Sequence, residues 1–354
     1  MNKLWGFIVA YFLRWFPHGL EPGLRRIGNP GPESPVLVSG NFSLTLKRLI
    51  RSLVGQDLWL LVANSRGINV WCAAVGGMFT HHNVIAAIKT SGLADQVRHR
   101  EVILPQLCAA GMDVKAIREE AGFQVRFGPV RAEDLPAYLA QGKKKTDAMS
   151  RFRFDLRHRL DMLLSNNTMF YLIVAIPLAI FWPHRLLAFT LLFWAAAFYL
   201  YLLFPYLPGK TGWSRSLYSA LAVVLAIPAA DFFRAGQPFL HYGWMIAVVL
   251  VFSTVGFDAA GILAAMPSDA EAFLHRLGIK RLGSLLQEKT LGRVALDREK
   301  CRGDMICYSI CPVGVFGELD PDKKITLPWQ NACFACGACV KQCPHDALSL
   351  QPRP

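Results

Sequence analysis

Four cysteines near the end of the chain are spaced as ligands of an iron–sulfur cluster. Cys333, Cys336, Cys339 and Cys343, followed directly by Pro344, form the run C-x2-C-x2-C-x3-C-P. In two-cluster proteins with this run, three cysteines hold one four-iron cluster and the fourth serves the other cluster. The spacing therefore predicts iron–sulfur chemistry and a second run of ligands elsewhere in the chain.

A second run lies upstream, with an acidic residue in place of one cysteine. Cys301, Cys307 and Cys311 keep the same spacing, and Asp304 stands where the second cysteine belongs. A carboxylate there either binds iron weakly through oxygen or leaves a three-iron cluster. The predicted fold of this end is a bacterial-type dicluster ferredoxin domain of the α+β class. Its two crossed ligand sets are Cys301, Asp304, Cys307 and Cys343 for the first cluster, and Cys333, Cys336, Cys339 and Cys311 for the second.

Zinc and disulfide bonds are the alternative uses of these cysteines. Structural zinc sites usually take two separated C-x2-C pairs rather than two runs of this kind. Disulfide bonds are rare in a reducing compartment. Two iron–sulfur clusters are therefore the favoured interpretation.

The composition indicates a membrane protein. Hydrophobic residues make up 53% of the 354 residues, and residues 168–266 are almost free of charge. A spanning helix needs about 20 apolar residues, so we expect an α-helical transmembrane domain of about four helices. The apolar stretches are 168–182, 186–207, 217–233 and 239–266. Asp231 and Asp258 lie near span ends, where they are either functional membrane carboxylates or hydrated interfacial ones.

Basic clusters set the expected orientation. They occupy residues 143–159, 210–215 and 276–281, before the first span, between the second and third, and after the fourth. Positive residues favour the cytoplasmic side, so we expect a multi-pass protein of the cell inner membrane with both soluble domains cytoplasmic. Because the net charge of +13 gathers beside the spans, the expected partner is anionic membrane lipid and not nucleic acid.

These observations divide the chain into six parts. Residues 1–20 hold an interfacial N-terminal helix, since the apolar stretch 5–16 is too short to span a bilayer. The remaining parts are an α/β domain (21–145), a basic linker (146–167), the transmembrane domain (168–266), a second linker (267–296) and the dicluster ferredoxin domain (297–354).

Apolar and amphipathic stretches alternate in the α/β domain. We expect strands at 35–39, 58–62, 68–70, 102–104 and 125–127, and helices at 44–54, 84–94, 114–121 and 132–139. Such alternation predicts a mainly parallel sheet. Ligands of these sheets bind beyond the carboxyl ends of the strands.

Cys72 follows the expected strand 68–70 and precedes a helix. A thiol at a helix start tends toward the thiolate, which is a soft metal ligand. The alternative is a small buried hydrophobe. Cys108 is expected to pack, with a metal-relay thiol as its alternative. His81 and His82 are expected at a solvated helix start. The alternative for this pair is that their imidazoles serve as ligands.

The segment Asn69, Val70, Trp71, Cys72, Ala73 and Ala74 resembles the cap-helix signature of the HgcA family, the membrane corrinoid proteins of microbial mercury methylation. The tail is similar to the HgcB family of ferredoxin partners. The chain thus looks like a fusion of the two, over nearly all its length. Further segments that carry the resemblance are 21–24, 28–30, 34–38, 66–70, 104–107 and 127–131.

The resemblance implies a Rossmann-like corrinoid-binding domain and a corrinoid-dependent methyltransferase. By this resemblance, Cys72 would be the lower axial ligand of cobalt in a cobalamin-type corrinoid. The residues on either side of Cys72 would bind the same cofactor. The implied reaction moves a methyl group from cobalt to Hg(II), and the fused ferredoxin domain reduces the cobalt again. Implied partners are a folate-linked methyltransferase as methyl donor and a cellular low-potential reductant. The residues implied to shape the cap are Asn69, Trp71, Ala73 and Ala74.

Two departures from the family pattern leave the methyl acceptor open. The signature continues Gly-Lys, whereas this chain has Val75 and Gly76, and no cysteine follows Cys343 to provide the partner family's terminal pair. A paralogue with another acceptor in one-carbon metabolism is the second hypothesis. A membrane ferredoxin-type electron-transfer subunit without corrinoid is the third, and cobalt content separates it from the other two.

Overall fold

The computed structural model describes residues 17–152, 155–203, 206, 292–333 and 335–352. Residues 16–152 and 291–354 together form one compact unit, and residues 1–15 with 153–290 form another. The expected N-terminal helix, the third and fourth spans, Asp231, Asp258 and most of the linker 267–296 lie outside the described residues.

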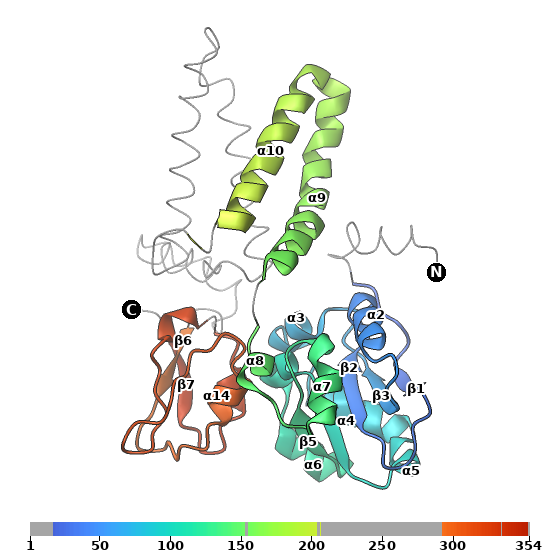
Figure 1. The fold of residues 1–354 in the computed structure, drawn as a ribbon, viewed down its shortest axis with the longest axis vertical. Coiled ribbons are helices and arrows are strands. Elements are labelled where there is room, and N and C mark those ends of the chain that lie inside the picture. Colours follow the sequence, from blue (N-terminus) through green and yellow to red (C-terminus); the bar gives the residue numbers. More distant parts are fainter. Residues whose placement is uncertain (1–16, 153–154, 204–205, 207–291, 334, 353–354) are drawn as a thin grey trace. The chain divides into compact units, whose positions relative to one another are not determined.

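A five-stranded sheet forms the centre of the α/β domain (Figure 1). Its spatial order is β1-β3-β2-β4-β5, with all neighbours parallel except β1, which is antiparallel to β3. The chain leaves β2 toward β3 on one side and returns to place β4 on the other side. The strands are β1 (Gly23–Ile27), β2 (Val36–Gly40), β3 (Leu58–Ala63), β4 (Glu101–Leu104) and β5 (Gln124–Phe127).

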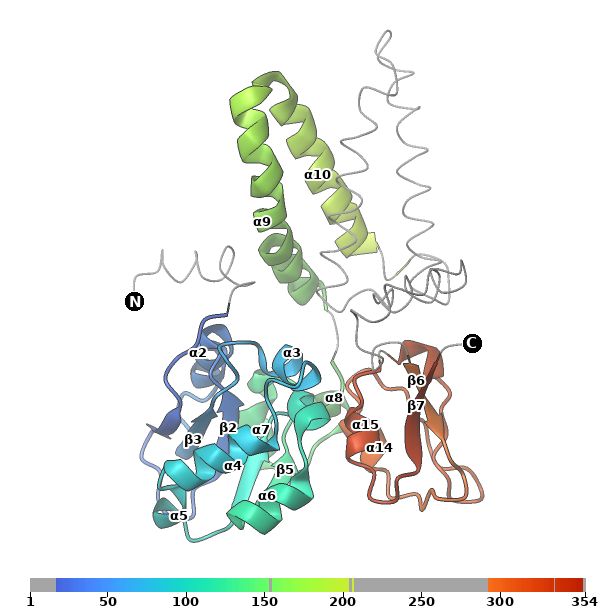
Figure 2. The same ribbon diagram turned by 180° about the vertical axis from the view of Figure 1, so that it is seen from behind.

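Helices cover both faces of this sheet, as Figures 1 and 2 show from opposite sides. α2 (Ser43–Ser52) and α7 (Leu135–Ala140) pack on one face, and α4 (His81–Thr90) and α6 (Val114–Ala121) pack on the other. Apolar side chains alternate between the faces. Leu37, Leu60 and Ile103 join the first core with α2 and α7, and Val38, Leu61 and Leu104 join the second with α4 and α6. This fold confirms the mainly parallel α/β domain.

Two elements differ from the expectation. The prediction of a strand at 68–70 is wrong, because Asn69 caps helix α3 (Val70–Val75) and its Oδ1 accepts a hydrogen bond from Trp71 N at 2.9 Å. The sheet gains β1 instead. This strand was missed because Arg25 and Arg26 interrupt its apolar pattern, as an edge strand allows. The guanidinium of Arg26 lies 5.5 Å from the centre of the Trp59 ring.

Shorter helices join these elements. α5 (Leu93–Gln96) follows α4, and the 3₁₀ helix η1 (Gln106–Gly111) follows β4. The expected helix 132–139 is divided into η2 (Ala132–Asp134) and α7. α8 (Asp147–Ser150) lies in the segment expected to be a linker.

The described part of the other unit is a pair of long helices. α9 (Leu156–Phe181) has 26 residues, and its most apolar 18-residue stretch has a mean hydropathy of 1.7. It is the one helix in the described residues that is long and apolar enough for a membrane span. It begins well before the expected start at residue 168, because Asp155 caps it by accepting a hydrogen bond from His158 N. α10 (Pro183–Leu203) follows with proline in its first turn. The Tyr171 hydroxyl and Thr190 Oγ1, 2.8 Å apart, join the two helices.

The ferredoxin end is closed by two antiparallel strands. β6 (Gly292–Leu296) pairs with β7 (Leu348–Pro352), and Leu296 lies opposite Leu348. β6 begins before residue 297, so the domain extends into the expected linker. Between the strands lie α14 (Ile306–Ile310), η5 (Gln330–Ala332) and α15 (Ala338–Lys341).

Candidate functional site

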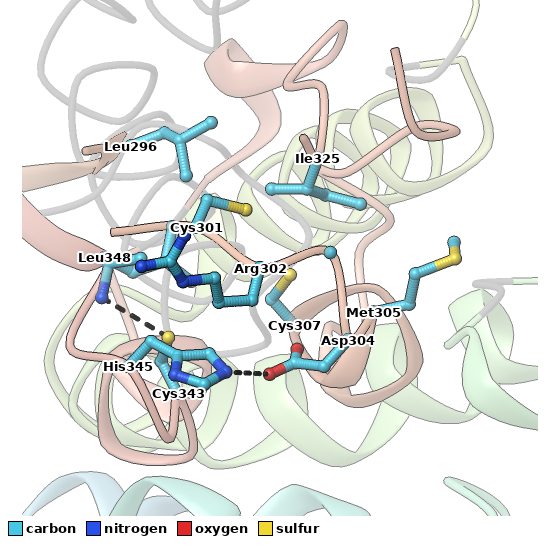
Figure 3. Close-up of a pocket in the computed structure, with 12 residues that line it drawn as sticks. Leu296, Cys301, Arg302, Asp304, Met305, Cys307, Ile325, Cys343, His345 and Leu348 are labelled. Atoms are coloured by element: carbon cyan, nitrogen blue, oxygen red, sulfur yellow. Dashed lines mark hydrogen bonds and ion pairs between the residues drawn. The ribbon is translucent and has the colours of Figure 1, made fainter. Parts of the chain in front are cut away.

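Three cysteines and one aspartate, drawn from both runs, line one pocket of the ferredoxin end (Figure 3). Cys301, Asp304 and Cys307 come from the loop before α14 and from its first turn, and Cys343 comes from the other run. The Asp304 carboxylate lies 3.5 Å from Nε2 of His345, and its Oδ1 accepts a hydrogen bond from Ile306 N. We call this site the Asp304 pocket.

The remaining four cysteines line a second pocket. Cys333, Cys336 and Cys339 surround it with Cys311, which the chain carries over from the upstream run. The two strands bring the runs together, and Val294 of β6 and Leu350 of β7 also line this pocket. We call this site the four-cysteine pocket. The structure thus groups all eight predicted cluster residues in the two expected sets, whereas their role as iron ligands stays a prediction.

Backbone amides point at several of the sulfurs. Val315 N donates to Cys311 Sγ, Ala335 N to Cys333 Sγ and Ala347 N to Cys343 Sγ, each over 3.4 Å. Hydrogen bonds to ligating sulfurs are one of the means by which proteins set cluster potentials. Both pockets therefore offer a donor set and an environment that suit clusters.

Burial raises the pKa of four thiols in the two pockets. It raises the pKa of Cys307 to about 12 and the pKa of Cys336 to about 12. Burial likewise raises the pKa of Cys311 and Cys339. Metal binding needs the thiolate, so iron incorporation releases protons and is favoured at higher pH.

Within the described residues, no group of three or more histidine, cysteine, aspartate or glutamate residues is arranged to hold one metal ion. Clusters rather than zinc stay a prediction, which the spacing of the two cysteine runs favours.

Cys72 lies at the surface, in the first turn of α3. This exposure removes the interpretation of a buried hydrophobe, which applies instead to Cys108, with no exposed area. Beside Cys72, Val75 is 39% exposed, and Gly76 and Gly77 are exposed too. The thiol therefore stands on an accessible surface of small and apolar residues.

The other predicted cofactor-binding residues, on either side of Cys72 in helix α3, lie partly at the surface and partly in the core. Asn69 is exposed and Trp71 is half-buried, whereas Ala73 and Ala74 are buried against the core. Small side chains are needed there because η1 approaches closely. A Cβ added to Gly111 would lie 2.3 Å from Phe79 O and 3.3 Å from Ala74 O.

A buried amide holds the loop that leads into α3. Asn41, which follows β2 and is 7% exposed, accepts hydrogen bonds at its Oδ1 from Ser65 N at 3.0 Å and Gly67 N at 2.9 Å. Its Nδ2 donates to Leu20 O. Gly67 has a φ of 66°, and a Cβ there would lie 2.7 Å from Gly19 N. This network fixes the path from β3 to the residues that carry Cys72.

Replacing Asn41 with alanine is expected to lower the free energy of unfolding by about 2 kcal/mol, because buried N–H groups lose their acceptor. Asn64→Ala is the matched control, since Asn64 is exposed and its Oδ1 accepts a hydrogen bond from the exposed Arg66 N. It should change the value by less than about 0.5 kcal/mol. Urea denaturation followed by circular dichroism measures both, and equal effects would contradict the role of Asn41.

Sequence reasoning missed several polar residues around these sites. Gln106, Arg151, Gln342 and His345 carry no motif, and their positions depend on how distant segments pack. His81 and His82 occupy the first turn of α4, as expected, with ring centres 4.0 Å apart.

Comparison with known proteins supports two domain types. Residues 14–139 match the family described as CO dehydrogenase/acetyl-CoA synthase delta subunit, and residues 300–348 match the family described as 4Fe-4S dicluster domain. The predicted fusion is thus supported at the level of these two types. The narrower resemblance to the HgcA and HgcB families stays a prediction.

Similar curated proteins are gamma subunits of the acetyl-CoA decarbonylase/synthase complex. The subunit from Archaeoglobus fulgidus is 35% identical over 125 residues, which cover 35% of this chain and 26% of the relative. The subunit from Methanopyrus kandleri is 39% identical over 126 residues, covering 35% and 27%. The subunit from Methanocaldococcus jannaschii is 40% identical over 96 residues, covering 27% and 20%. The chain therefore spans about a quarter of the length of these relatives.

Proposed function

We propose that this chain is a corrinoid and iron–sulfur protein that transfers methyl groups. The observation that carries the proposal is the exposed thiol of Cys72 on a capped helix of the α/β domain, in the same compact unit as two cysteine-lined pockets. A bound corrinoid would supply a cobalt centre that accepts a methyl group when reduced and passes it on. The named relatives belong to an acetyl-CoA decarbonylase/synthase complex, which supports one-carbon metabolism as the setting.

The cap residues would serve a bound corrinoid in different ways. Cys72 would present its sulfur as the lower axial ligand of cobalt. Asn69 holds the first turn of the helix by accepting the hydrogen bond from Trp71 N, and the half-buried ring of Trp71 would lie beside the cofactor. Ala73 and Ala74 keep the helix close to η1. The exposed surface around Val75 suits a large, flat macrocycle.

The two pockets would hold the clusters that deliver low-potential electrons. The four-cysteine pocket offers four sulfurs and suits a four-iron cluster. The Asp304 pocket offers three sulfurs and a carboxylate, so it suits either a four-iron cluster with one oxygen ligand or a three-iron cluster. A cellular low-potential reductant would supply the electrons.

The acceptor of the methyl group is proposed to be a partner in one-carbon metabolism, within a protein complex like that of the relatives. The donor would be a folate-linked methyltransferase. Mercury methylation is the second candidate, because the exposed Cys72 lies in the segment 69–74 that resembles the mercury-methylating family. Val75 and Gly76, in place of Gly-Lys, weigh against it.

Labelled methyl transfer distinguishes these candidates. The purified full chain is loaded with a corrinoid under anaerobic conditions, methylated with a ¹⁴C-methyl donor, and offered either an acetyl-CoA synthase preparation or Hg(II). Label that moves to the synthase supports the first candidate, and labelled methylmercury supports the second. A chain that takes up no methyl group under either condition would contradict both.

We further propose that the chain is a multi-pass protein of the inner membrane with both soluble parts in the cytoplasm. The helix α9 and the basic residues near its start support this placement. Fusions of alkaline phosphatase or green fluorescent protein to each end test it. Fluorescence and no phosphatase activity are expected at both ends, and an active phosphatase at the C-terminus would imply an odd number of spans.

A further inference from the structure

Two buried glutamines join the α/β part and the ferredoxin part of the compact unit. Gln106 of η1 is 1% exposed, and its Nε2 donates to Ser150 O at 2.9 Å and to Ile310 O at 3.1 Å. Its Oε1 accepts from Lys145 Nζ at 2.8 Å. Every polar position of this amide is therefore used, which ties the end of α14 to η1 and α8.

Gln342 makes the corresponding connection from the ferredoxin side. It is 8% exposed, and its Nε2 donates to Ala109 O at 2.9 Å and to Met112 O at 2.7 Å. Ala109 is buried among the residues of the ferredoxin core. One glutamine lies in the α/β part and the other in the ferredoxin part, and each donates two hydrogen bonds from Nε2. The two amides therefore fix η1 against α14 and α15.

The residues after α8 hold the loop of Cys311. Arg151 Nη1 donates to Cys311 O at 3.1 Å, and the guanidinium lies 4.5 Å from the centre of the Tyr308 ring. The next residue, Phe152, donates its backbone N–H to Pro312 O at 2.8 Å. A Cβ at Gly314 would lie 3.1 Å from Arg151 Nη1, so the approach is close.

The ring of Phe152 also contacts helix α3. Its ring centre lies 6.4 Å from the ring centre of Trp71, at an angle of 46°. Trp71 directly precedes Cys72 in the chain. One hydrogen bond and one ring contact thus connect Cys311 and Pro312, at the four-cysteine pocket, with the residue beside the exposed thiol.

The Asp304 pocket is also connected to the α/β part. Tyr308, next to Cys307, packs against Arg151, and its hydroxyl donates to Asp147 Oδ2 at 3.1 Å. Gln342, next to Cys343, binds the far end of η1, and Lys341 Nζ lies 3.6 Å from Asp113 Oδ2, the residue that caps α6. The contacts of Gln342 and Lys341 join the ferredoxin part to η1 and to α6. The aromatic contact with α3 comes from the Cys311 side.

We propose that Phe152 and Trp71 make the four-cysteine pocket, and not the Asp304 pocket, the direct electron donor to the cofactor at the cap helix. This inference rests on the proposed function. The step moves one electron: a reduced four-iron cluster returns to its oxidised state as cobalt goes from Co(II) to Co(I). No proton is transferred, and any bond from the Cys72 sulfur to Co(II) is released with the sulfur leaving as thiolate. A low-potential one-electron reductant, titanium(III) citrate in the test below, replaces the electron.

Electron paramagnetic resonance tests the order of the clusters in the unmodified chain. Co(II) is paramagnetic and accelerates the relaxation of a nearby cluster, so the microwave power that half-saturates each cluster signal is compared with and without bound Co(II) corrinoid. The four-iron signal of the four-cysteine pocket is expected to shift several-fold more than the signal of the Asp304 pocket. A larger shift for the Asp304 pocket would overturn the inference.

Two variants test the contact itself. Phe152→Leu and Phe152→Ala are expected to slow single-turnover reduction of bound cobalt by titanium(III) citrate several-fold, with unchanged iron and cobalt contents. Trp329→Leu is the matched control, because Trp329 belongs to the ferredoxin part and is 59% exposed. Unchanged rates in cobalt-loaded variants would overturn the inference alone, whereas a chain that binds no cobalt would remove the proposed function as well.

Discussion

Replacing Cys72 with alanine is expected to lower methyl transfer on the order of a hundred-fold, which is the scale of losing one group that acts on a reacting centre. Corrinoid content should change far less, because a large macrocycle makes many contacts and the axial sulfur acts mainly on the electronics of the metal. The optical spectrum of the oxidised protein should therefore shift while the cobalt stoichiometry is kept.

Val75→Ala is the matched control for this change. Val75 lies on the same helix and is 39% exposed, but it carries no donor atom. It should leave the spectrum unchanged. If the spectra of Cys72→Ala and the unmodified chain coincide when cobalt is bound, Cys72 is not the axial ligand.

Replacing Asp304 with cysteine is expected to give the Asp304 pocket a stable four-iron cluster. A fourth thiolate binds the corner iron more strongly than a carboxylate does, so iron content after anaerobic purification should rise by about one per chain. In the unmodified protein, paramagnetic resonance before and after iron addition should show interconversion between three-iron and four-iron forms. The variant should lose this interconversion.

Asp322→Cys tests whether any added thiol has the same effect. Asp322 belongs to the same domain, and its side chain is 76% exposed outside both pockets. It should retain the interconversion of the unmodified chain. Two stable and indistinguishable four-iron clusters in the unmodified chain would show that Asp304 does not set the first cluster apart.

The iron–sulfur part was the easiest to predict, because cluster ligation imposes a spacing on the chain. The crossed grouping of Cys311 with Cys336, and of Cys343 with Cys307, follows from that spacing and from strand pairing at the two ends. His345 could not be predicted beside Asp304, since no spacing rule governs a residue that only approaches a ligand.

The α/β part was predicted where local patterns agree with the sheet. The β2, β3, β4 and β5 strands are apolar runs, whereas β1 carries two arginines and depends on pairing with β3. The apolar residues 68–70 looked like a strand, but the amide of Asn69 stabilises a helix start there. The hydrogen bond from Trp71 N to Asn69 Oδ1 thus favours the start of helix α3 over a strand.

The contacts between the two soluble parts were beyond sequence reasoning. Gln106 and Ile310 are 204 positions apart, and Gln342 and Ala109 are 233 apart. Nothing in either local sequence distinguishes these glutamines from surface ones. Their burial depends on the fusion of both parts in one chain.

Metal analysis of the unmodified full chain tests the central claim most directly. The protein is purified anaerobically from cells supplied with a corrinoid, and cobalt and iron are measured against protein concentration. We expect about one cobalt and about seven or eight iron atoms per chain. Iron at that level without cobalt would contradict the proposed corrinoid and would leave a membrane electron-transfer subunit as the function.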